Sequence, residues 1–320
     1  MHLVTGGAGF IGINLIERLL SRGEPVIALD NLVRGREAYL RRFEGRAGFR
    51  FKQVDCADLA ALRRCLNEIG PAGAIREVWH LAANSDIPAG VADPLVDHRD
   101  TFLTTFNTLM VMRELKIPAI RFSSSSSIYG EFGDKLIAED SGPLRPISNY
   151  GAMKLAAEAQ ISAARETFLG RADIFRFPNV VGTPATHGVI YDFIAKLRRT
   201  PDRLDVLGDG SQQKPYMHVD ELIDAMLFIV MRADERFNVF NIAPDDDGVT
   251  VRFIAETVCD IVAPRAEIRF GTGDRGWVGD VPKFRYSTAR LERLGWRPKL
   301  SSTDAVRRAA RQIAAQGPRE

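Results

Sequence analysis

The sequence predicts an α/β fold: a doubly wound parallel sheet with a smaller, interleaved C-terminal domain. Through the first half of the chain, short apolar runs alternate with longer segments of helical period, as in βαβ units around a parallel sheet. A glycine-rich turn separates the first apolar run from the first helical segment. Doubly wound folds have such a turn at their first βα junction.

The order of the elements follows from these runs. We expect strands at residues 2–5, 25–30, 49–54, 77–82, 119–124 and 172–177. Between them we expect helices at 10–22, 58–68, 99–115 and 149–168. The first helix shows the pattern, because its apolar side chains recur on one face, at Ile11, Leu15, Ile16, Leu19 and Leu20. Such a face packs against a sheet.

The second half of the chain has a different rhythm. After residue 178, glycine and proline are more frequent and the elements are shorter, so we expect a second domain to begin there. An apolar helical segment at 219–232 and a strand-like segment at 237–243 are expected to return to the first domain. The expected domains are therefore 1–178 with 219–243, and 179–218 with 244–320.

Composition limits the partners and the compartment. A hydrophobic fraction of 45% and a charged fraction of 26% are typical of globular proteins. The net charge of +2 is too small to hold nucleic acid or an anionic membrane, so we expect neither partner. The opening MHLV does not resemble a signal peptide. Cys56, Cys65 and Cys259 fall in no metal-ligand spacing, which favours free thiols, no metal site and a cytoplasmic location.

Three glycines form the first candidate site. Gly6, Gly9 and Gly12 stand three apart, directly after a strand and before a helix. The first permits a tight turn, the second lets backbone approach a pyrophosphate, and the third lets helix and sheet pack closely. Because a purely structural turn can carry the same pattern, the next strand decides between the two interpretations.

That next strand ends in Asp30, about twenty residues further on, where a carboxylate can accept the hydroxyls of an adenosine ribose. The same carboxylate repels the 2′-phosphate of NADP, so the pattern predicts NAD. Arg34 lies nearby and is the residue that could instead receive a 2′-phosphate. A solvated aspartate at a strand end is the alternative interpretation of Asp30.

Tyr150 and Lys154 stand four apart in a helical segment and therefore project from one face. A neighbouring cation, together with a positive nicotinamide ring, is expected to lower the tyrosine pKa from about 10 by roughly one to three units. The phenol could then act as a base near neutral pH. This spacing also arises by chance in many helices, so its value depends on its order after the glycine turn.

A run of serines, FSSSSSIYG, follows the strand expected at 119–124. In a parallel sheet, ligands bind at the carboxyl ends of the strands, where a serine hydroxyl can hydrogen-bond a reacting sugar oxygen. The alternative is a turn capped by its own serine side chains.

Taken together, TGGAGFIG, Asp30, HLAA at 80–83, the serine run and YGAMK resemble the extended short-chain dehydrogenases that modify nucleotide sugars. Later segments are similar to sugar-binding stretches of UDP-galactose 4-epimerase relatives: RFPNVVG (176–182), HGVIYDFI (187–194), LGDGSQQKPYMHVDE (207–221) and RGWVGDVPKFRYSTARLERLGW (275–296). The resemblance covers nearly the whole chain. It implies a Rossmann-like domain that binds NAD, a nucleotide-sugar domain and no metal.

The resemblance also implies roles for residues. The catalytic residues would be Ser125, Tyr150 as base and Lys154. The cofactor-binding residues would be Gly6, Gly9, Phe10, Ile11, Gly12, Asp30, Asn31, Asp55, Cys56, Leu81, Ala82, Ala83, Ser123, Tyr150, Lys154, Phe177 and Pro178. The substrate-binding residues would be Asn84, Ser125, Ser126, Asn179, His187, Gly188, Val189, Leu207, Lys214, Tyr216, Arg275 and Asp280.

Several positions depart from the family pattern. Lys214 and Pro215 stand where the family usually has Arg-Asp, which keeps a cation but loses the bidentate fork. Trp277 replaces an arginine before GDV, and Arg275 is the nearest candidate to take its place. These departures leave the nucleotide and the sugar open.

The serine run also bears on the reaction. Relatives that eliminate water carry an acid at this position, whereas Ser125, Ser126 and Ser127 offer no carboxylate. The sequence therefore favours reversible oxidation at C4 and C4 epimerisation of a nucleotide-diphosphate sugar of the UDP-hexose kind. The alternatives are a reductase of a 4-keto sugar, a dehydratase and a non-catalytic NAD-binding regulator.

A homodimer is also expected. The segments 99–115 and 149–168 resemble the helix pair that forms a four-helix interface in the family. Phe102, Phe106 and Leu109 have a suitable spacing for a contact face, although burial against the chain's own sheet would explain them as well.

Overall fold

The structure is a computed structural model, and it describes residues 1–70, 74–274, 281 and 283–316. The chain divides into two compact units. Unit 1 comprises Met1–Gly130, Pro143–Arg176 and Met226–Phe240. Unit 2 comprises Glu131–Gly142, Phe177–Ala225 and Asn241–Glu320, apart from the residues that are not described.

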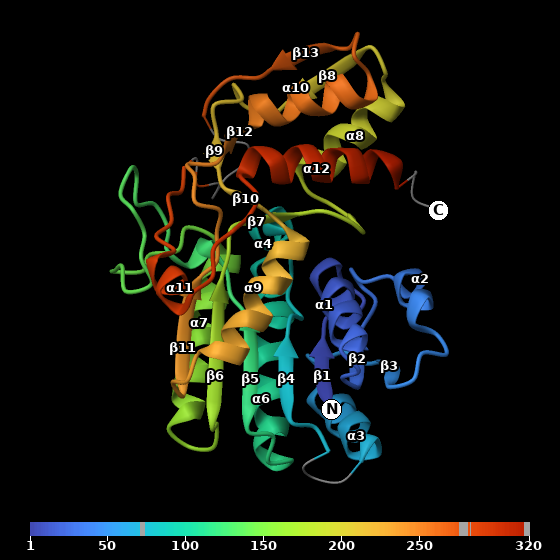
Figure 1. The fold of residues 1–320 in the computed structure, drawn as a ribbon, viewed down its shortest axis with the longest axis vertical. Helices are drawn as coiled ribbons and strands as arrows, with labels where there is room; N and C mark the ends of the chain where they lie inside the picture. Colours follow the sequence, from blue (N-terminus) through green and yellow to red (C-terminus); the bar gives the residue numbers. More distant parts are fainter. Residues whose placement is uncertain (71–73, 275–280, 282, 317–320) are drawn as a thin grey trace. The chain divides into compact units, whose positions relative to one another are not determined.

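Unit 1 is built on a sheet with the strand order β11-β6-β5-β4-β1-β2-β3 (Figure 1). The strands are β1 (His2–Thr5), β2 (Val26–Asp30), β3 (Phe49–Gln53), β4 (Glu77–His80), β5 (Ala119–Ser123), β6 (Arg171–Arg176) and β11 (Phe237–Asn241). From β3 to β6 each strand pairs with its neighbours in parallel. The chain winds outwards from β1 in both directions, which confirms the predicted doubly wound sheet.

Helices α3 (Leu59–Ile69), α6 (Thr104–Glu114) and α7 (Asn149–Arg165) cover one face of this sheet. Their apolar residues, among them Leu66, Val111 and Ile161, share one core with Ile27 and Phe122 of the strands. Helix α1 (Phe10–Ser21) follows β1, and its Leu15, Ile16 and Leu19 are buried as its period predicted. Short α2 (Glu37–Leu40) and the 3₁₀ turn Arg41–Phe43 precede β3.

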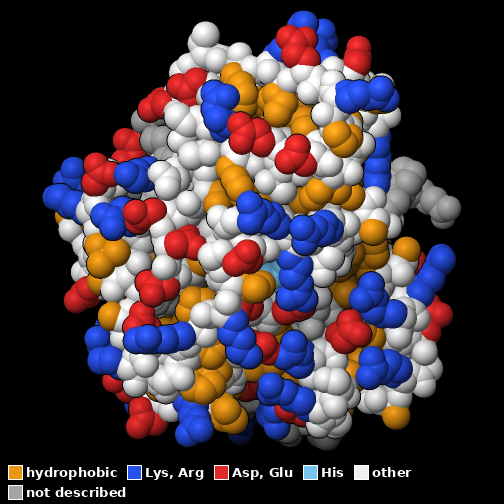
Figure 2. Space-filling model, turned by 45° about the horizontal axis from the view of Figure 1, so that its top comes forward, with side chains coloured by type: hydrophobic (Ala, Val, Ile, Leu, Met, Phe, Trp, Pro, Cys, Tyr) orange, Lys and Arg blue, Asp and Glu red, His pale blue; other side chains and the backbone are white. Residues whose placement is uncertain are grey.

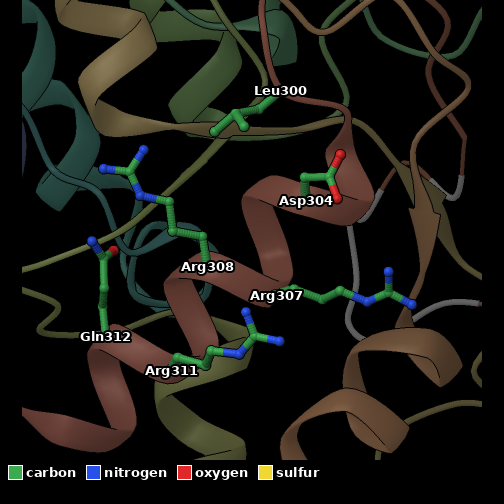
Figure 3. Close-up of a pocket in the computed structure, with 6 residues that line it drawn as sticks. All are labelled: Leu300, Asp304, Arg307, Arg308, Arg311 and Gln312. Carbon is green, nitrogen blue, oxygen red and sulfur yellow. The ribbon is translucent and has the colours of Figure 1, made fainter.

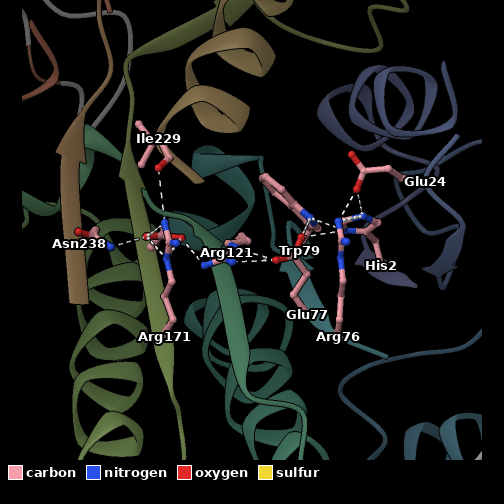
Figure 4. Close-up of polar contacts among 10 residues, drawn as sticks. His2, Glu24, Arg76, Glu77, Trp79, Arg121, Arg171, Ile229 and Asn238 are labelled. Carbon is pink, nitrogen blue, oxygen red and sulfur yellow. Dashed lines mark hydrogen bonds and ion pairs between the residues drawn. The ribbon is translucent and has the colours of Figure 1, made fainter. Parts of the chain in front are cut away.

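The opposite face of the sheet carries a row of buried charges (Figure 4). Arg121 of β5 donates from Nη2 to Glu77 Oε2 of β4 at 2.7 Å and from Nη1 to Asp173 of β6. Asn238 of β11 donates to Asp173 Oδ1 at 2.6 Å. Burial alone would raise the pKa of Glu77, but His2 and Arg121 hold it at about 2. Buried charges that are paired in this way are tolerated.

The helix expected at 99–115 is present, but it begins earlier than expected and its first part is a π-helical turn. The structure has α4 (Ile87–Ala92), then α5 (Pro94–Asp97), a π-helical turn (His98–Leu103) and α6. Thr104 Oγ1 donates to Asp100 O at 3.1 Å and Thr105 Oγ1 donates to Thr101 O at 2.9 Å. These hydroxyls compete with backbone amides for the same carbonyl groups, which agrees with a locally widened turn.

Unit 2 has its own core. Helices α8 (Val189–Arg199), α10 (Val251–Val262) and α12 (Ser302–Ala315) bury apolar residues such as Phe193, Val258 and Val306. Small sheets accompany them: β7 (Asn179–Val181) with β10 (Tyr216–His218), β8 (Arg203–Val206) with β13 (Glu267–Phe270), and β9 (Gln213–Lys214) with β12 (Val249–Thr250). Helix α11 (Ala289–Leu294) precedes α12.

The division into units differs from the expected domains in two places. Residues 131–142 belong to unit 2, because Ile137 bridges to Tyr286 and its carbonyl accepts from Asn241 Nδ2 at 3.0 Å. Helix α9 (Val219–Arg232) begins in unit 2 and ends in unit 1, so only residues 226–240 of the expected return belong to unit 1. The periodicity of apolar residues in the sequence does not indicate either of these two differences.

Three further observations concern charge, membranes and thiols. On the face shown in Figure 2, Lys and Arg side chains are interspersed with Asp and Glu. Within the described residues, none of the helices has the length and apolarity needed to cross a bilayer. Cys56, Cys65 and Cys259 are all free thiols.

Candidate functional site

The glycine loop has the geometry of an anion cradle. Gly6 has φ +69°, and the Gly9 amide donates to Gly6 O at 3.1 Å. A Cβ at Gly12 would lie 2.3 Å from Gly6 O, so only glycine lets α1 approach the loop this closely. Phe10 and Ile11 open α1, whose first turn carries no acidic residue. The helix N-terminus is therefore suited to phosphate groups.

Asp30 ends β2 beside this loop. Its Oδ2 accepts from the Ala8 amide at 2.9 Å and its Oδ1 from the Leu32 amide at 2.8 Å. Burial raises the pKa of Asp30, and the two amides lower it. Each carboxylate oxygen still has a lone pair for a ribose hydroxyl. The next residue, Asn31, accepts from the Val33 amide at 3.1 Å.

Arg34, which could have received a 2′-phosphate, instead pairs with Asp86. The distance between Arg34 Nη2 and Asp86 Oδ2 is 2.8 Å. A guanidinium engaged in this way, beside the carboxylate of Asp30, fits NAD better than NADP.

The other residues assigned to the cofactor in unit 1 surround the same loop or lie at the ends of neighbouring strands. Leu81 donates from its amide to Thr5 O at 3.1 Å. A Cβ at Gly6 would lie 2.8 Å from the Ala82 amide, which places the Leu81–Ala83 segment against the loop. Asp55 accepts from Arg99, while Cys56 is buried and its carbonyl accepts from Asn107 Nδ2 at 3.0 Å.

Ser125, Tyr150 and Lys154 come together in unit 1. Ser125 precedes a short 3₁₀ turn (Ser126–Ile128) and its hydroxyl hydrogen-bonds the Tyr150 phenol. Lys154, 2% exposed, donates from Nζ to Ser123 O at 2.6 Å and lies 5.9 Å from the centre of the Tyr150 ring. Ser126 is buried in the 3₁₀ turn. The structure therefore brings the predicted catalytic residues to one place.

The expected lowering of the tyrosine pKa is wrong for the chain on its own. Burial raises the pKa of Tyr150 to about 12; the Ser125 hydrogen bond lowers it, and Asp97 raises it. Burial also lowers the pKa of Lys154 to about 7, against the charges of Glu158 and Asp97. The physical reason is desolvation, which penalises the phenolate and the ammonium alike.

Sequence reasoning missed a buried ion pair next to these residues. Arg176 at the end of β6 donates from Nη2 to Glu158 Oε2 at 2.6 Å, and Ser124 donates its hydroxyl to Glu158 Oε1. The signal was available, because Glu158 stands four residues after Lys154 and so lies one helical turn further along α7. Asp97, a second buried carboxyl, had no such sequence signal.

Asn84, assigned to the substrate, is 3% exposed and fully engaged inside unit 1. Its Nδ2 donates to Asp86 O and to Asp97 Oδ1, both at 2.8 Å, and its Oδ1 accepts from the Asp86 amide at 3.0 Å. The assignment of Asn84 to the substrate stays a prediction. Asn84 holds the chain segment that leads from β4 into α4.

Unit 2 carries most of the remaining assigned residues. Phe177 and Pro178 open it, and Asn179 of β7 is exposed beside Tyr216 of β10. Tyr216 is 5% exposed and belongs to the unit's own core, and its assignment to the base or sugar stays a prediction. Lys214 lies half-exposed in β9.

The other described residues assigned to the substrate are partly or fully exposed: His187, Gly188, Val189 and Leu207. Arg275 and Asp280 lie outside the described residues.

Unit 2 also has a cavity of about 580 Å³ lined by Leu300, Asp304, Arg307, Arg308, Arg311 and Gln312 (Figure 3). Arg308 already pairs with Asp220, and Arg307 lies over the Phe253 ring at 5.4 Å. None of the assigned catalytic, cofactor or substrate residues lines this cavity. It is therefore not the candidate catalytic site.

A comparison with known proteins decides the family. The model of the "NAD dependent epimerase/dehydratase family" matches residues 2–243, more than half of the chain. The chain belongs to this family. Its cofactor is NAD, which the glycine loop and Asp30 fit by their geometry.

Individual relatives can be aligned with this chain over nearly their full length. A putative UDP-glucose 4-epimerase of Methanocaldococcus jannaschii is 28% identical over 96% of each chain. A crystal structure of UDP-galactose 4-epimerase is 33% identical, with TM-score 0.85 over 98% of this chain and 99% of that one. A dTDP-glucose 4,6-dehydratase from Streptomyces venezuelae, solved with NAD bound, is 25% identical, with TM-score 0.87 over 99% and 97%. This epimerase/dehydratase family member thus resembles enzymes of both reaction types.

Two glycine substitutions should separate cofactor binding from folding in this family member. Gly9→Ala is expected to lower the melting temperature of the free protein only slightly, because its Cβ would be close to a single atom, Gly6 O at 3.2 Å, which needs to move by only a few tenths of an ångström. It should lose most of the stabilisation by NAD, because the methyl group obstructs the pyrophosphate. Gly12→Ala should destabilise the free protein by about 1 to 3 kcal/mol, because the loop must move. Thermal unfolding with and without NAD measures both; full stabilisation of Gly9→Ala by NAD would contradict the assignment.

Proposed function

We propose that this protein catalyses NAD-dependent C4 epimerisation of a nucleotide-diphosphate sugar of the UDP-hexose kind, through a transient 4-keto sugar. The observation that carries the proposal is the convergence of Ser125, Tyr150 and Lys154 beside the serine run, in the unit that holds the glycine loop. The names of the relatives support epimerisation.

Each residue has a defined task. The glycine loop and Asp30 would hold NAD, which would supply reversible hydride transfer at the sugar carbon. Tyr150 removes the proton of the C4 hydroxyl and later gives it back. Ser125 hydrogen-bonds the same sugar oxygen and the phenol. Lys154 is held in position by Ser123 O, and in its charged form it stabilises the phenolate of Tyr150. Epimerisation requires in addition that the keto sugar turns over before the hydride returns.

The carboxyl groups beside the catalytic residues argue against elimination of water. Glu158 comes closest to the serine run, but its two oxygens are engaged by Arg176 and Ser124. Asp97 is fully buried. A dehydratase needs a free acid and a base around the keto sugar, so the described geometry favours epimerisation.

The substrate residues of unit 2 remain proposals, Tyr216 among them. A homodimer and a cytoplasmic location are also proposals, and both derive from the sequence. The Phe102 and Phe106 rings lie 6.4 Å apart and Phe106 is 38% exposed, which leaves an aromatic surface available, whereas Leu109 is buried in the chain's own core.

The test is a panel of UDP-, GDP-, CDP- and dTDP-sugars deuterated at C4, incubated with the purified protein and separated by chromatography with mass detection. We expect an isomer of unchanged mass with deuterium retained at C4 and no net consumption of added NADH. Loss of water would show a dehydratase, and turnover only with added NADH would show a reductase. NAD binding without any turnover would show the non-catalytic regulator.

A further inference from the structure

The pair formed by Glu158 and Arg176 is held in a fixed geometry. Arg176 donates from Nε to Glu158 Oε1 at 3.0 Å and from Nη2 to Oε2 at 2.6 Å, a bidentate contact. The side chains are only 7% and 8% exposed. Two planar groups bonded in this way fix each other's orientation.

The pair secures the serine run on both sides of Ser125. Ser124 donates its hydroxyl to Glu158 Oε1, and Arg176 donates from Nη1 to the Tyr129 hydroxyl at 3.0 Å. Ser124 and Tyr129 are fully buried, so neither contact is exchanged with solvent. The backbone that presents Ser125 and the Ser123 carbonyl is thereby tied to α7.

Glu158 also acts on the charge of Lys154. The ionisable groups that face Lys154 are Glu158 and Tyr150 on α7, Asp97 on α5 and His80 on β4. His80 is held neutral, because burial and Lys154 lower its pKa to about 3. Burial lowers the pKa of Lys154, and the negative charges of Glu158 and, to a smaller extent, Asp97 raise it.

We propose that Glu158, fixed by Arg176, is a positioning residue that ties the serine run to α7 and places a negative charge one helical turn from Lys154. This inference rests on the proposed function, since it assigns Glu158 an effect through Lys154 and Ser125. Glu158 itself does not touch the substrate, because both of its oxygens are engaged inside the protein.

The same sheet offers a matched control. Glu77 and Arg121 form another buried pair, 8% and 6% exposed, on the face of the sheet opposite to the α7 side (Figure 4). Glu77→Gln removes one of the two carboxylates that pair with Arg121, and Glu158→Gln removes the carboxylate that pairs with Arg176, so both should lower the melting temperature, Glu77→Gln by less because Asp173 remains. Only Glu158→Gln should change the chemistry.

Two measurements carry the test. In Glu158→Gln we expect kcat to fall about tenfold or more, with KM changed little, and the basic limb of the kcat profile to move about one pH unit lower. NMR titration of ¹⁵N-labelled lysine amines, with Lys154 assigned by its loss in Lys154→Met, should show the same downward move. In Glu77→Gln both profiles should match the wild type, and Glu158→Asp should restore part of the wild-type titration.

A titration of Lys154 that is the same in Glu158→Gln and Glu77→Gln would overturn the inference. The NMR titration needs no turnover. A wild-type protein that converts no sugar would therefore contradict the proposed function, and the titration of Lys154 could still be interpreted. Should Glu158→Gln not fold, Ser124→Ala tests the tie alone: we expect a lower kcat with an unshifted Lys154 titration. An unchanged kcat in Ser124→Ala would overturn the role of the tie.

Discussion

Replacing Tyr150 with phenylalanine is expected to lower turnover by about 10²- to 10⁴-fold, the usual contribution of a general base. The substitution removes only the phenol oxygen and its hydrogen bond with Ser125. The ring remains, so the melting temperature should stay close to that of the wild type, and so should its increase on adding NAD. Steady-state kinetics and thermal unfolding measure the two effects.

The matched control is Tyr39→Phe in α2, which changes the same group at another half-buried tyrosine of unit 1. It should leave turnover within about twofold of the wild type. Near-normal turnover in Tyr150→Phe, with the fold intact, would remove the assigned base and the mechanism with it.

Lys154→Met is expected to abolish most activity and at the same time to stabilise the free protein. The amine is 2% exposed and burial lowers its pKa from 10.5 to about 7. A buried charge replaced by an apolar side chain of similar length often stabilises a protein, here by about 2 to 4 kcal/mol near pH 7. Activity should fall at least about 100-fold, because the phenol loses its neighbouring cation.

The gain in stability should depend on pH with a definite sign. Between pH 7 and 10.5 the unfolded lysine binds a proton that the folded protein does not hold, so this group makes the wild type more stable as pH rises. The advantage of Lys154→Met is therefore largest at pH 7 and below, and shrinks towards pH 10. Cys56, whose pKa burial raises to about 12, acts in the opposite direction above pH 9 but equally in both proteins.

Denaturant unfolding of the two proteins at several pH values between 6 and 9.5 gives this difference directly. Lys196→Met is the control, because Lys196 lies on the exposed side of α8 and donates to Asp205 O. Its stability relative to wild type should not change with pH. A difference between Lys154→Met and wild type that is constant across the range would show that Lys154 stays charged in the folded protein.

The strands and helices of unit 1 could be predicted closely because their signals are local. The apolar period of α1 and the position of the glycine loop place these elements to within a few residues. The helix expected at 99–115 is present, but its first part is π-helical, which agrees with threonine hydroxyls that compete for its carbonyls, an effect that apolar period does not contain. The assignment of 131–142 to unit 2 depends on contacts with residues more than 100 positions away.

The candidate site shows the same limit. Helical spacing together with the family resemblance pointed to Ser125, Tyr150 and Lys154, and the structure brings them together. Spacing could not show that Asn84 and Tyr216 are buried and engaged inside the protein. Nor could it show that the Lys154 amine bonds to Ser123 O instead of serving the phenol alone.

By itself, the sequence determined the doubly wound sheet and the NAD loop and predicted the reacting side chains, because periodicity, glycine spacing and residue chemistry are properties of the chain itself. Only the tertiary structure decided the partners that hold those side chains and the direction in which burial shifts their pKa values. Desolvation and buried ion pairs such as Glu158 with Arg176 depend on which groups share the interior. That neighbourhood exists only once distant segments have packed together.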